Sequence, residues 1–189
     1  MTYLPLAGIK ILSVEQYGAG PYGTMLLADL GAEIIKIEAP SMGGDVSRAT
    51  GPYFLGENDS QFFQTFSRGK KSLAIEIKTP EGRGMFEELV KSADAVANNL
   101  RGDQPAKMQL TYDDLKAINP KIVCAHLSAY GRDNERAAWP GYDYLMQAEA
   151  GLMSMTGEPD GPPARCGLSI IDFHTGSHLA VGLLAGVLG

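Results

Sequence analysis

Apolar residues recur along the chain with two periods, and these periods predict a series of strands and helices. Apolar runs typical of buried strands occur at residues 9–15, 32–40, 72–77, 94–99 and 121–131. Helical spacing follows at residues 24–31, 79–92 and 111–120, and a longer apolar helix is expected at residues 175–189. Strands that alternate with helices favour an α/β fold with a mostly parallel sheet and helices on both faces.

Residues with strong conformational preferences mark the ends of these elements. Pro21 suits the first turn of a helix because its φ is fixed and it has no N–H, and Gly31 is typical of a C-terminal cap. Thr79 before Pro80 predicts the N-cap and the first position of another helix. The stretch from 41 to 60, rich in Gly, Ser and Asn, is expected to be a loop.

The helix expected at residues 175–189 is apolar on all sides and reaches the last residue without a polar cap. A helix of this kind must be covered by other protein, and little sequence remains to cover it. We therefore expect either that the chain is cut short or that a partner chain supplies the missing layer.

Composition and charge limit the partners. The chain has 189 residues, of which 44% are hydrophobic and 20% charged, which suits one ordinary globular domain. A net charge of -6 argues against nucleic acid or an anionic membrane as the main partner. No run of about 18 apolar residues and no signal peptide is found, which predicts a cytoplasmic protein without a membrane span. Cys124 and Cys166 form no CxxC pair and are expected to be reduced thiols.

A glycine-rich stretch follows the first predicted strand. Gly18, Gly20 and Gly23 have the spacing of the dinucleotide-binding fingerprint, and an acidic residue, Glu38, lies about twenty positions further on. In that fingerprint the first glycine follows the strand almost at once, whereas here residues 15–17 intervene. The stretch therefore predicts a tight strand-to-helix turn rather than an NAD site.

An ordered series of segments covers nearly the whole chain and resembles the class III coenzyme A transferase family (CaiB/BaiF-like and formyl-CoA transferase-like). The segments are GIKILSVEQYGAGPYGTMLLADLGAEIIKIEAP (8–40), GGD (43–45), KKSLAIEIKTPEG (70–82), NNLR (98–101), INPKIVCAHLSAYG (118–131), GYDYLMQAEAGLMSMTGEPDGPPARCG (141–167) and IDFHTG (171–176). The resemblance implies a Rossmann-like α/β fold that binds coenzyme A (CoA) instead of NAD.

Family members are about twice as long as this chain and form interlocked homodimers. The resemblance therefore implies that residues 1–189 are the N-terminal part of the large, Rossmann-like domain, without the small domain and the C-terminal return segment. It also implies a homodimer, or a complementing C-terminal polypeptide, as the partner.

The resemblance also implies a reaction and a nucleophile. Family members move CoA between carboxylic acids through an aspartyl acyl anhydride and an aspartyl-CoA thioester. Asp172, in GLSIIDFHTG, matches the family's nucleophile. Backbone N–H groups at the start of the last helix are expected to bind its carboxylate or the oxyanion of the tetrahedral intermediate. The residue pattern alone leaves an alternative, in which Asp172 only caps that helix.

The substrates implied are CoA or acyl-CoA and carboxylic acids, with no tightly bound cofactor. Lys78, Arg101 and Lys107 supply positive charge at the binding positions, although each taken alone is typical of a solvated surface residue. Lys107 stands where some members have arginine, which exchanges a bidentate fork for a point charge. All the binding positions implied for CoA are Gly18, Ala19, Ile75, Lys78, Asn99, Leu100, Arg101, Lys107, Ser128, Tyr130 and Gly131.

Two alternative functions stay open. The α-methylacyl-CoA racemases share the fold but use a histidine in a GHD triplet, where this chain has Gly141, Tyr142 and Asp143. A tyrosine, with a usual pKa near 10, exchanges protons poorly at neutral pH, so the transferase is favoured. The second alternative is a CoA-binding or nucleotide-binding fragment without turnover.

The remaining candidates have structural interpretations. His126 lies in a strand-like run and is expected to be buried or half-buried with a partner. His174 and His178 are four residues apart without a third ligand, so packing or capping is favoured over a metal site, and His174 is a candidate for tuning Asp172. A last segment is expected to be a helix that buries one face, formed by Tyr144, Leu145, Leu152 and Met153.

Overall fold

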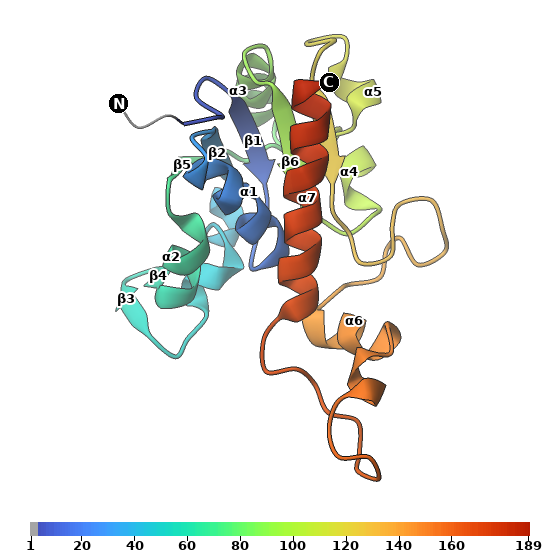
Figure 1. The fold of residues 1–189 in the computed structure, drawn as a ribbon. Coiled ribbons are helices and arrows are strands. Elements are labelled where there is room, and N and C mark those ends of the chain that lie inside the picture. The colour runs from blue at the N-terminus through green and yellow to red at the C-terminus, as the bar shows by residue number, and fades with distance from the viewer. Residues whose placement is uncertain (1–3) are drawn as a thin grey trace.

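The computed structural model describes residues 4–189, so the first three residues of the predicted 1–189 unit lie outside it. Five parallel strands form one sheet in the order β5-β2-β1-β6-β7 (Figure 1). Their bounds are β1 Lys10–Val14, β2 Glu33–Glu38, β5 Lys70–Ala74, β6 Ala95–Asn98 and β7 Val123–His126. The prediction of a parallel, Rossmann-like α/β fold is confirmed.

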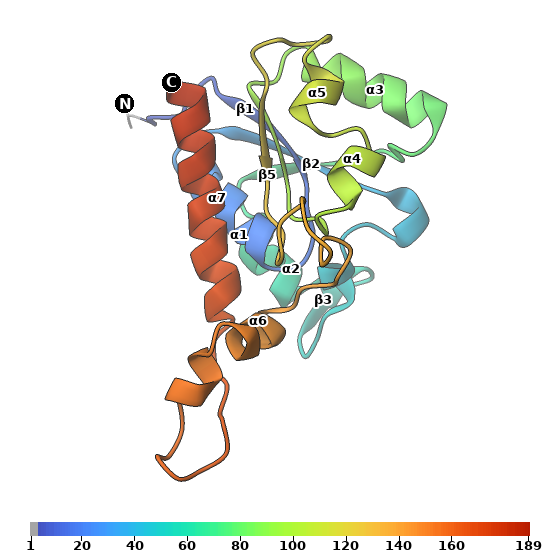
Figure 2. The same cartoon turned by 90° about the vertical axis from the view of Figure 1, so that its right-hand side faces the viewer.

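Helices cover both faces of the sheet because both faces are apolar. Figure 2 shows α1 (Ala19–Asp29) and α7 (Ile170–Leu188) on one side, and α3 (Pro80–Val90), α4 (Gln104–Lys107) and α5 (Tyr112–Leu115) on the other. Successive strand residues alternate between the two sides. In β1, Ile11 belongs to the core beneath α1 and α7, and Leu12 belongs to the core beneath α3 and α5.

The strand order places β1 next to β6, where the direction of the chain across the sheet reverses. Loops after the carboxyl ends of such strands form the usual ligand crevice of this fold. Here the two loops are joined directly. Gln16 N donates to Asn99 Oδ1 (2.9 Å), and Asn99 Nδ2 donates to Gln16 O (2.7 Å).

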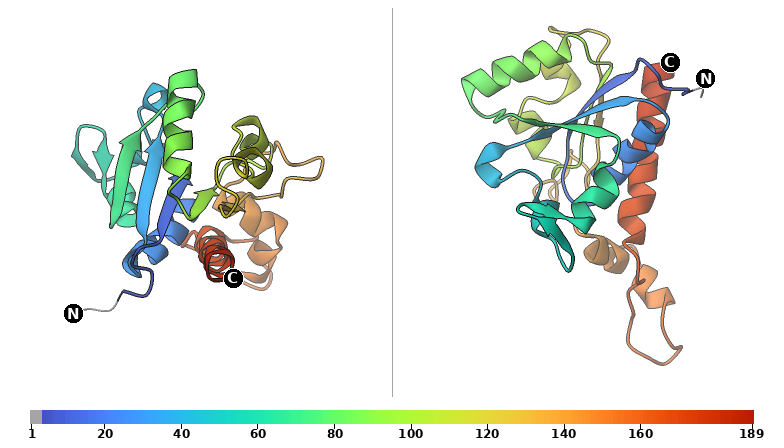
Figure 3. Two further views of the ribbon diagram at one scale, coloured as in Figure 1. Left: turned by 90° about the horizontal axis from the view of Figure 1, so that it is seen from above. Right: turned by 90° about the vertical axis from the view of Figure 1, so that its left-hand side faces the viewer.

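The segment from 41 to 60 contains more structure than the loop that its composition predicts. It folds into two 3₁₀ turns, η1 (Pro40–Met42) and η2 (Val46–Ala49), and a hairpin of β3 (Phe54–Gly56) and β4 (Asp59–Ser60). An unexpected helix, α2 (Gln61–Ser67), follows. Figure 3 shows the hairpin beyond the β5 edge of the sheet.

Among the predicted details of the elements, the following are wrong. The strand expected at 72–77 begins at Lys70, because β5 pairs with β2 from Lys70 opposite Ile34. The last helix begins at Ile170 rather than at 175. In α6 (Asp143–Glu149), Tyr144 and Leu145 are 49% and 37% exposed instead of buried.

Gln147 is the residue that α6 buries. It makes hydrogen bonds to the chain before α7, and this polar anchoring replaces the apolar face that the sequence predicts. After α6 and the 3₁₀ turn η3 (Leu152–Met155), the chain up to about residue 168 projects from the body of the protein (Figure 1).

Helix α7 is long and apolar enough, by length and composition alone, to cross a membrane. One side of it packs on the sheet through Leu179, Ala180 and Leu183. Its other side exposes Val181 and Leu188. That some further protein covers this side remains a prediction.

Helices α1 and α7 cross at a pair of glycines. A Cβ added to Gly23 would lie 2.4 Å from the carbonyl oxygen of Gly176, and a Cβ added to Gly176 would lie 2.4 Å from the carbonyl oxygen of Ala19. The two backbones are therefore in direct contact, and this contact fixes where the N-terminal end of α7 lies relative to the glycine-rich loop.

Replacing Gly23 by alanine is expected to lower the free energy of unfolding by about 1–3 kcal/mol, because a backbone carbonyl cannot move aside as a flexible side chain would. Gly182 is a matched control in α7, since a Cβ there meets no described atom within 4 Å. Gly182→Ala should be neutral or stabilising by up to about 1 kcal/mol through helix propensity. Urea denaturation measures both changes, and a Gly23→Ala variant as stable as the wild type would contradict the close crossing.

Candidate active site

Asp172 lies where α7 meets the glycine-rich loop. It is the third residue of α7 and is half-buried. Its carboxylate faces the N-terminus of α1, because a Cβ added to Gly18 would lie 2.8 Å from Asp172 Oδ2. Gly18 thus leaves room for this carboxylate, and any larger residue would displace it.

The surroundings of Asp172 make its carboxyl group more basic. Burial, and secondarily the negative charge of Asp143, raise the pKa of Asp172 from 3.8 to about 6. The group is therefore still ionised at neutral pH. A carboxylate with little solvation and a raised pKa is a better nucleophile than a surface aspartate.

The expectation that backbone N–H groups at the start of the last helix bind the Asp172 carboxylate is wrong. The N–H groups of Ile171 and Asp172 donate instead to Asp143 Oδ1, at 2.8 and 3.1 Å. His174 is exposed, and the charged group that perturbs Asp172 within residues 4–189 is Asp143 rather than this histidine.

The loop before Gly18 is held on three sides. Glu15 accepts hydrogen bonds from Thr24 Oγ1 (2.8 Å) and Lys70 Nζ (2.7 Å). The next residue is clamped by Asn99, and Tyr17 N donates to Asp45 Oδ1 (3.0 Å). Tyr17 has a φ of 66°, in the left-handed region that non-glycine residues rarely adopt. These contacts offset that strain and direct the chain toward Gly18.

A network of buried charges lies beneath this loop. Lys36 Nζ is 2.6 Å from Asp45 Oδ2 and 3.8 Å from Glu15 Oε1, and Lys70 Nζ pairs with the same Glu15 oxygen. The contact between Lys36 and Asp45 is a buried ion pair. Burial opposes the ionisation of Glu15, but Lys70 and Lys36 outweigh it and lower the pKa of Glu15.

Each glycine of the dinucleotide-like motif has a packing role that requires no dinucleotide. Gly20 lies against the Asn99 side chain, as Gly18 does against Asp172 and Gly23 against α7. Both oxygens of Glu38 are occupied, since they accept from Arg48, from Ser72 and from the backbone N–H of Asp45. Burial opposes ionisation there, but these donors lower the pKa of Glu38 to about 2.

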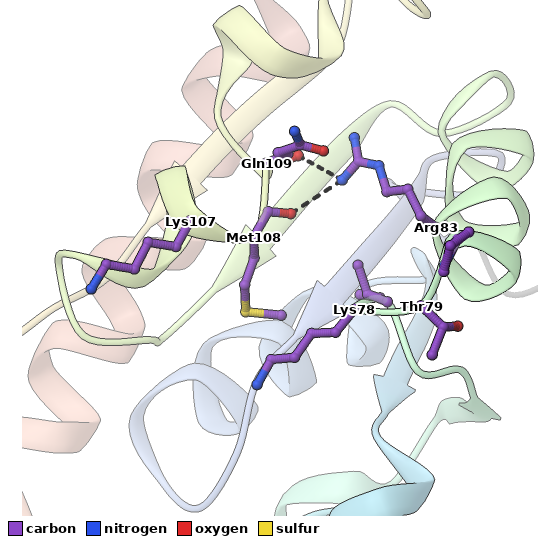
Figure 4. A pocket seen from close by; sticks show the side chains of 8 residues that line it. Lys78, Thr79, Arg83, Lys107, Met108 and Gln109 are labelled. Carbon is purple, nitrogen blue, oxygen red and sulfur yellow. Dashed lines mark hydrogen bonds between the residues drawn. The ribbon is translucent and has the colours of Figure 1, made fainter.

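Both lysines implied for CoA line one cavity. Lys78 and Lys107 stand on its sides, with Met108 between them, and its volume is about 340 Å³ (Figure 4). Arg83, from α3, forms a further wall, and its Nη1 donates to the carbonyl oxygens of Met108 (3.1 Å) and Gln109 (2.9 Å). The cavity lining therefore carries three basic side chains and no acidic one, although Arg83 Nε is paired with Glu87 (2.7 Å), and the cavity opens to solvent.

The loops after β6 and β7 also meet. Asp103 N donates to the carbonyl oxygen of Ala137 (3.2 Å), and a Cβ added to Gly102 would lie 1.9 Å from the carbonyl oxygen of Gly131. Arg101 and Lys107 both pair with Asp103, at 3.5 and 2.6 Å. This brings the implied binding residues of these two loops to one region.

The other implied CoA contacts differ in accessibility. Ser128 and Tyr130 are half-buried, and Tyr130 packs edge-on against Trp139. Leu100 is half-buried against the core. Ile75 is 5% exposed and its N–H donates to the carbonyl oxygen of Glu38, so a contact with CoA cannot come from its side chain or its N–H.

The histidine and cysteine side chains have neighbours that are typical of structural rather than metal-binding residues. His126 is half-buried, with Nδ1 2.7 Å from Asn98 Nδ2, as expected, and burial lowers its pKa to about 4. His174 and His178 pack edge-on at 4.5 Å between ring centroids. Cys124 and Cys166 are free thiols. Within residues 4–189, no three His, Cys, Asp or Glu side chains gather as metal ligands would.

Sequence reasoning missed three residues of this region. Asp143 lies in the GYD triplet, in which the sequence analysis used only the tyrosine, to argue against a racemase. Lys36 is a charged residue within the apolar run EIIKIE, and such an interruption is the signal for a buried ion pair. Arg83 gives no signal, because an arginine in an amphipathic helix is typical of a solvated face.

Comparisons with known proteins identify relatives of this chain. The chain is 39% identical to the succinate–glutarate CoA-transferase of Agrobacterium fabrum over 97% of this chain and 47% of that protein. It is 38% identical to the succinyl-CoA:glutarate CoA-transferase of Homo sapiens over 97% of this chain and 42% of that protein. The crystal structure of a CAIB/BAIF family protein from Brucella suis matches with a TM-score of 0.91 at 34% identity, and covers 99% of this chain and 50% of that one.

The chain thus spans about half the length of the curated relatives it matches. It also matches CoA-transferase family III over residues 6–189. Together with the nucleotide-type fold and the carboxylate at the glycine-rich loop, this match shows that the chain belongs to CoA-transferase family III.

Proposed function

We propose that this chain forms the N-terminal part of the large domain of an enzyme that moves CoA between two carboxylic acids, with Asp172 as nucleophile. The observation that carries the proposal is the carboxylate of Asp172. It is half-buried, faces Gly18, and has its pKa raised to about 6. Within residues 4–189 it accepts no hydrogen bond that would tie it to a capping role.

The reaction uses this one carboxylate throughout. An oxygen of Asp172 attacks the acyl carbon of an acyl-CoA, the C–S bond breaks, and CoA leaves as a thiolate with the donor acyl group held as an anhydride. The thiolate then attacks Cγ of Asp172, which releases the donor acid and leaves an aspartyl-CoA thioester. An acceptor carboxylate attacks the same carbon and forms a second anhydride with loss of the thiolate. Attack of the thiolate on the acceptor's acyl carbon regenerates Asp172.

The N-terminus of α1 supplies electrostatic support for these steps. The first N–H groups of a helix have no partner within it, and they attract negative charge. In α1 these groups belong to Ala19 and its neighbours, next to the Asp172 carboxylate. They are therefore better placed for an oxyanion than the N–H groups of α7, which Asp143 occupies.

The phosphates of CoA fit the basic cavity beside the sheet. Lys78 and Lys107 line it, and Arg101 shares Asp103 with Lys107. Gly18, Asn99, Ser128 and Gly131 would border the path from this cavity toward Asp172, because all of them follow the carboxyl ends of parallel strands. Lysine and arginine side chains are the usual ligands of such phosphates.

Activity of the whole protein requires more than these residues, since the relatives are about twice as long. We propose that the remainder is supplied by further chain or by a complementing C-terminal polypeptide, in a homodimer. The racemase alternative is less favoured, because Tyr142 stands at its histidine position.

Incubation of the complete protein, meaning this chain together with the remainder proposed above, with succinyl-CoA, followed by proteolysis and mass analysis, tests the nucleophile. We expect one peptide containing Asp172 to gain either a succinyl group or CoA, because both covalent intermediates form on that side chain. Asp172→Asn should gain neither. Binding of CoA without any adduct would favour the alternative of a binding fragment, and an adduct on another residue would reject Asp172.

A further inference from the structure

Helix α7 begins with an arrangement that its own sequence does not supply. Ser169 occupies the N-cap position, but its side chain makes no capping hydrogen bond. The first N–H groups of a helix need acceptors from elsewhere. Asp143 supplies them from α6, since its Oδ1 accepts from Ile171 N and Asp172 N.

Asp143 is itself held in place. The buried side chain of Gln147, one turn along α6, donates through Nε2 to Asp143 Oδ2 and to the carbonyl oxygen of Leu168 (3.2 Å). Gln147 Oε1 accepts from Cys166 N (2.8 Å). The start of α7, the chain before it and α6 are therefore joined as one unit around two polar side chains.

Helix α5 of the same chain shows what an aspartate at the third helical position does otherwise. There Asp114 accepts from the N–H (3.0 Å) and hydroxyl (2.6 Å) of the N-cap residue Thr111, in a capping box. Asp172 holds the equivalent position in α7 but faces Gly18. The difference between the two helices is that in α7 the N–H groups of the first turn bond to an aspartate from another helix.

We infer that Asp143 is a positioning residue for Asp172: it caps α7 in place of Asp172, which leaves the Asp172 carboxylate turned toward Gly18 with a second negative charge beside it. The inference rests on the proposed function only where it takes Asp172 as the nucleophile. The contacts of Asp143 exist whatever Asp172 does. A nucleophile must not spend its oxygens on capping hydrogen bonds, and a nearby like charge disfavours its ionised state.

Within residues 4–189, Asp143 is the charged group that perturbs the pKa of Asp172. From α1 it meets Gly18, and from α6 it meets Asp143. On α7 the nearest titratable side chain in sequence, His174, is exposed. A change in the titration of Asp172 after a substitution at 143 is therefore assignable to that residue.

Two substitutions separate the two roles of Asp143. Asp143→Asn keeps an oxygen for the N–H groups of α7 but removes the charge, whereas Asp143→Ala removes both. We expect the titration midpoint of the Asp172 carboxyl group, followed by carbon-13 NMR and assigned by its loss in Asp172→Asn, to fall in both variants. In Asp143→Ala alone, the amides of Ile171 and Asp172 should exchange with solvent about fivefold faster or more, as after loss of a helix cap.

Asp114→Ala is the matched control, because it removes a cap from a different helix. It should leave both the midpoint of Asp172 and the exchange of these two amides unchanged. An unchanged midpoint in both Asp143 variants would overturn the electrostatic role, and unchanged amide exchange in Asp143→Ala would overturn the capping role. Neither measurement needs turnover, so these failures are distinct from failure of the proposed function, which appears as an adduct or CoA transfer persisting in Asp172→Asn.

Discussion

Replacing Asp172 by asparagine is expected to reduce the rate of CoA transfer on the order of 10⁴-fold or more, because an amide at this position cannot form the anhydride or the thioester. The measurement is the exchange of CoA between succinyl-CoA and an acceptor acid, separated by chromatography. Asp160, an exposed aspartate in the projecting segment, is the control, and Asp160→Asn should transfer CoA at the wild-type rate.

Stability distinguishes this loss of activity from unfolding. Folding raises the pKa of Asp172 from 3.8 to about 6, so above pH 6 the wild-type chain is destabilised by burying the charged form. The penalty shrinks as the pH falls from about 6 and is absent below about 4, where the carboxyl group is neutral in both states. Asp172→Asn is therefore expected to be more stable than the wild type at pH 7 and equally stable at low pH.

The same pKa predicts how the proposed reaction depends on pH. The reactive form is the carboxylate, so the rate of adduct formation should fall about tenfold per pH unit below pH 6. If Asp172→Asn is stably folded and still transfers CoA, Asp172 is not the nucleophile. A rate that stays constant down to pH 4 would show that the carboxyl group is not perturbed as the structure indicates.

Replacing Lys36 by methionine is expected to lower the free energy of unfolding by about 3–5 kcal/mol, because removing one partner leaves buried charges uncompensated. The Lys36 side chain is 1% exposed and is the ion-pair partner of Asp45 Oδ2. Burial opposes ionisation of Asp45, and Lys36, together with the N–H groups of Ser47 and Tyr17, outweighs burial and lowers its pKa. Urea denaturation at pH 7 measures the loss.

Lys71 is a matched control for Lys36. It pairs with Glu33 at 2.5 Å, but its side chain is 71% exposed. Exposed pairs contribute about 0–1 kcal/mol, so Lys71→Met should be almost neutral. A second variant, Lys36→Met with Asp45→Asn, removes the uncompensated charge and should recover part of the stability. Equal effects of Lys36→Met and Lys71→Met would show that the buried network contributes no more than a surface pair.

Loss of the network has a consequence for the site as well. Asp45 holds the N–H of Tyr17, and Tyr17 precedes the glycine that faces Asp172. The charges beneath the loop therefore link the stability of the first two strands to the geometry of the candidate nucleophile.

Much of the candidate site was predictable from the family resemblance together with the strand pattern. The carboxyl ends of successive strands carry the residues implied for CoA, and parallel pairing brings those ends to one edge. This is why Asn99 and the residues near Gly18 meet although about 80 positions separate them. The surroundings of Asp172 were not predictable, because its perturbing partner, Asp143, lies in another helix.

The sequence by itself determined the alternation of strands and helices, the parallel sheet and the family, because apolar periodicity and ordered motifs are local properties of the chain. Only the tertiary structure decided which aspartate caps α7 and which faces Gly18, because both have the same chemistry and similar helix positions. It also decided that the three glycines of the loop accommodate a carboxylate, an amide and a helix backbone. The physical reason is that close approach and burial depend on what other segments bring to a residue, which no local pattern contains.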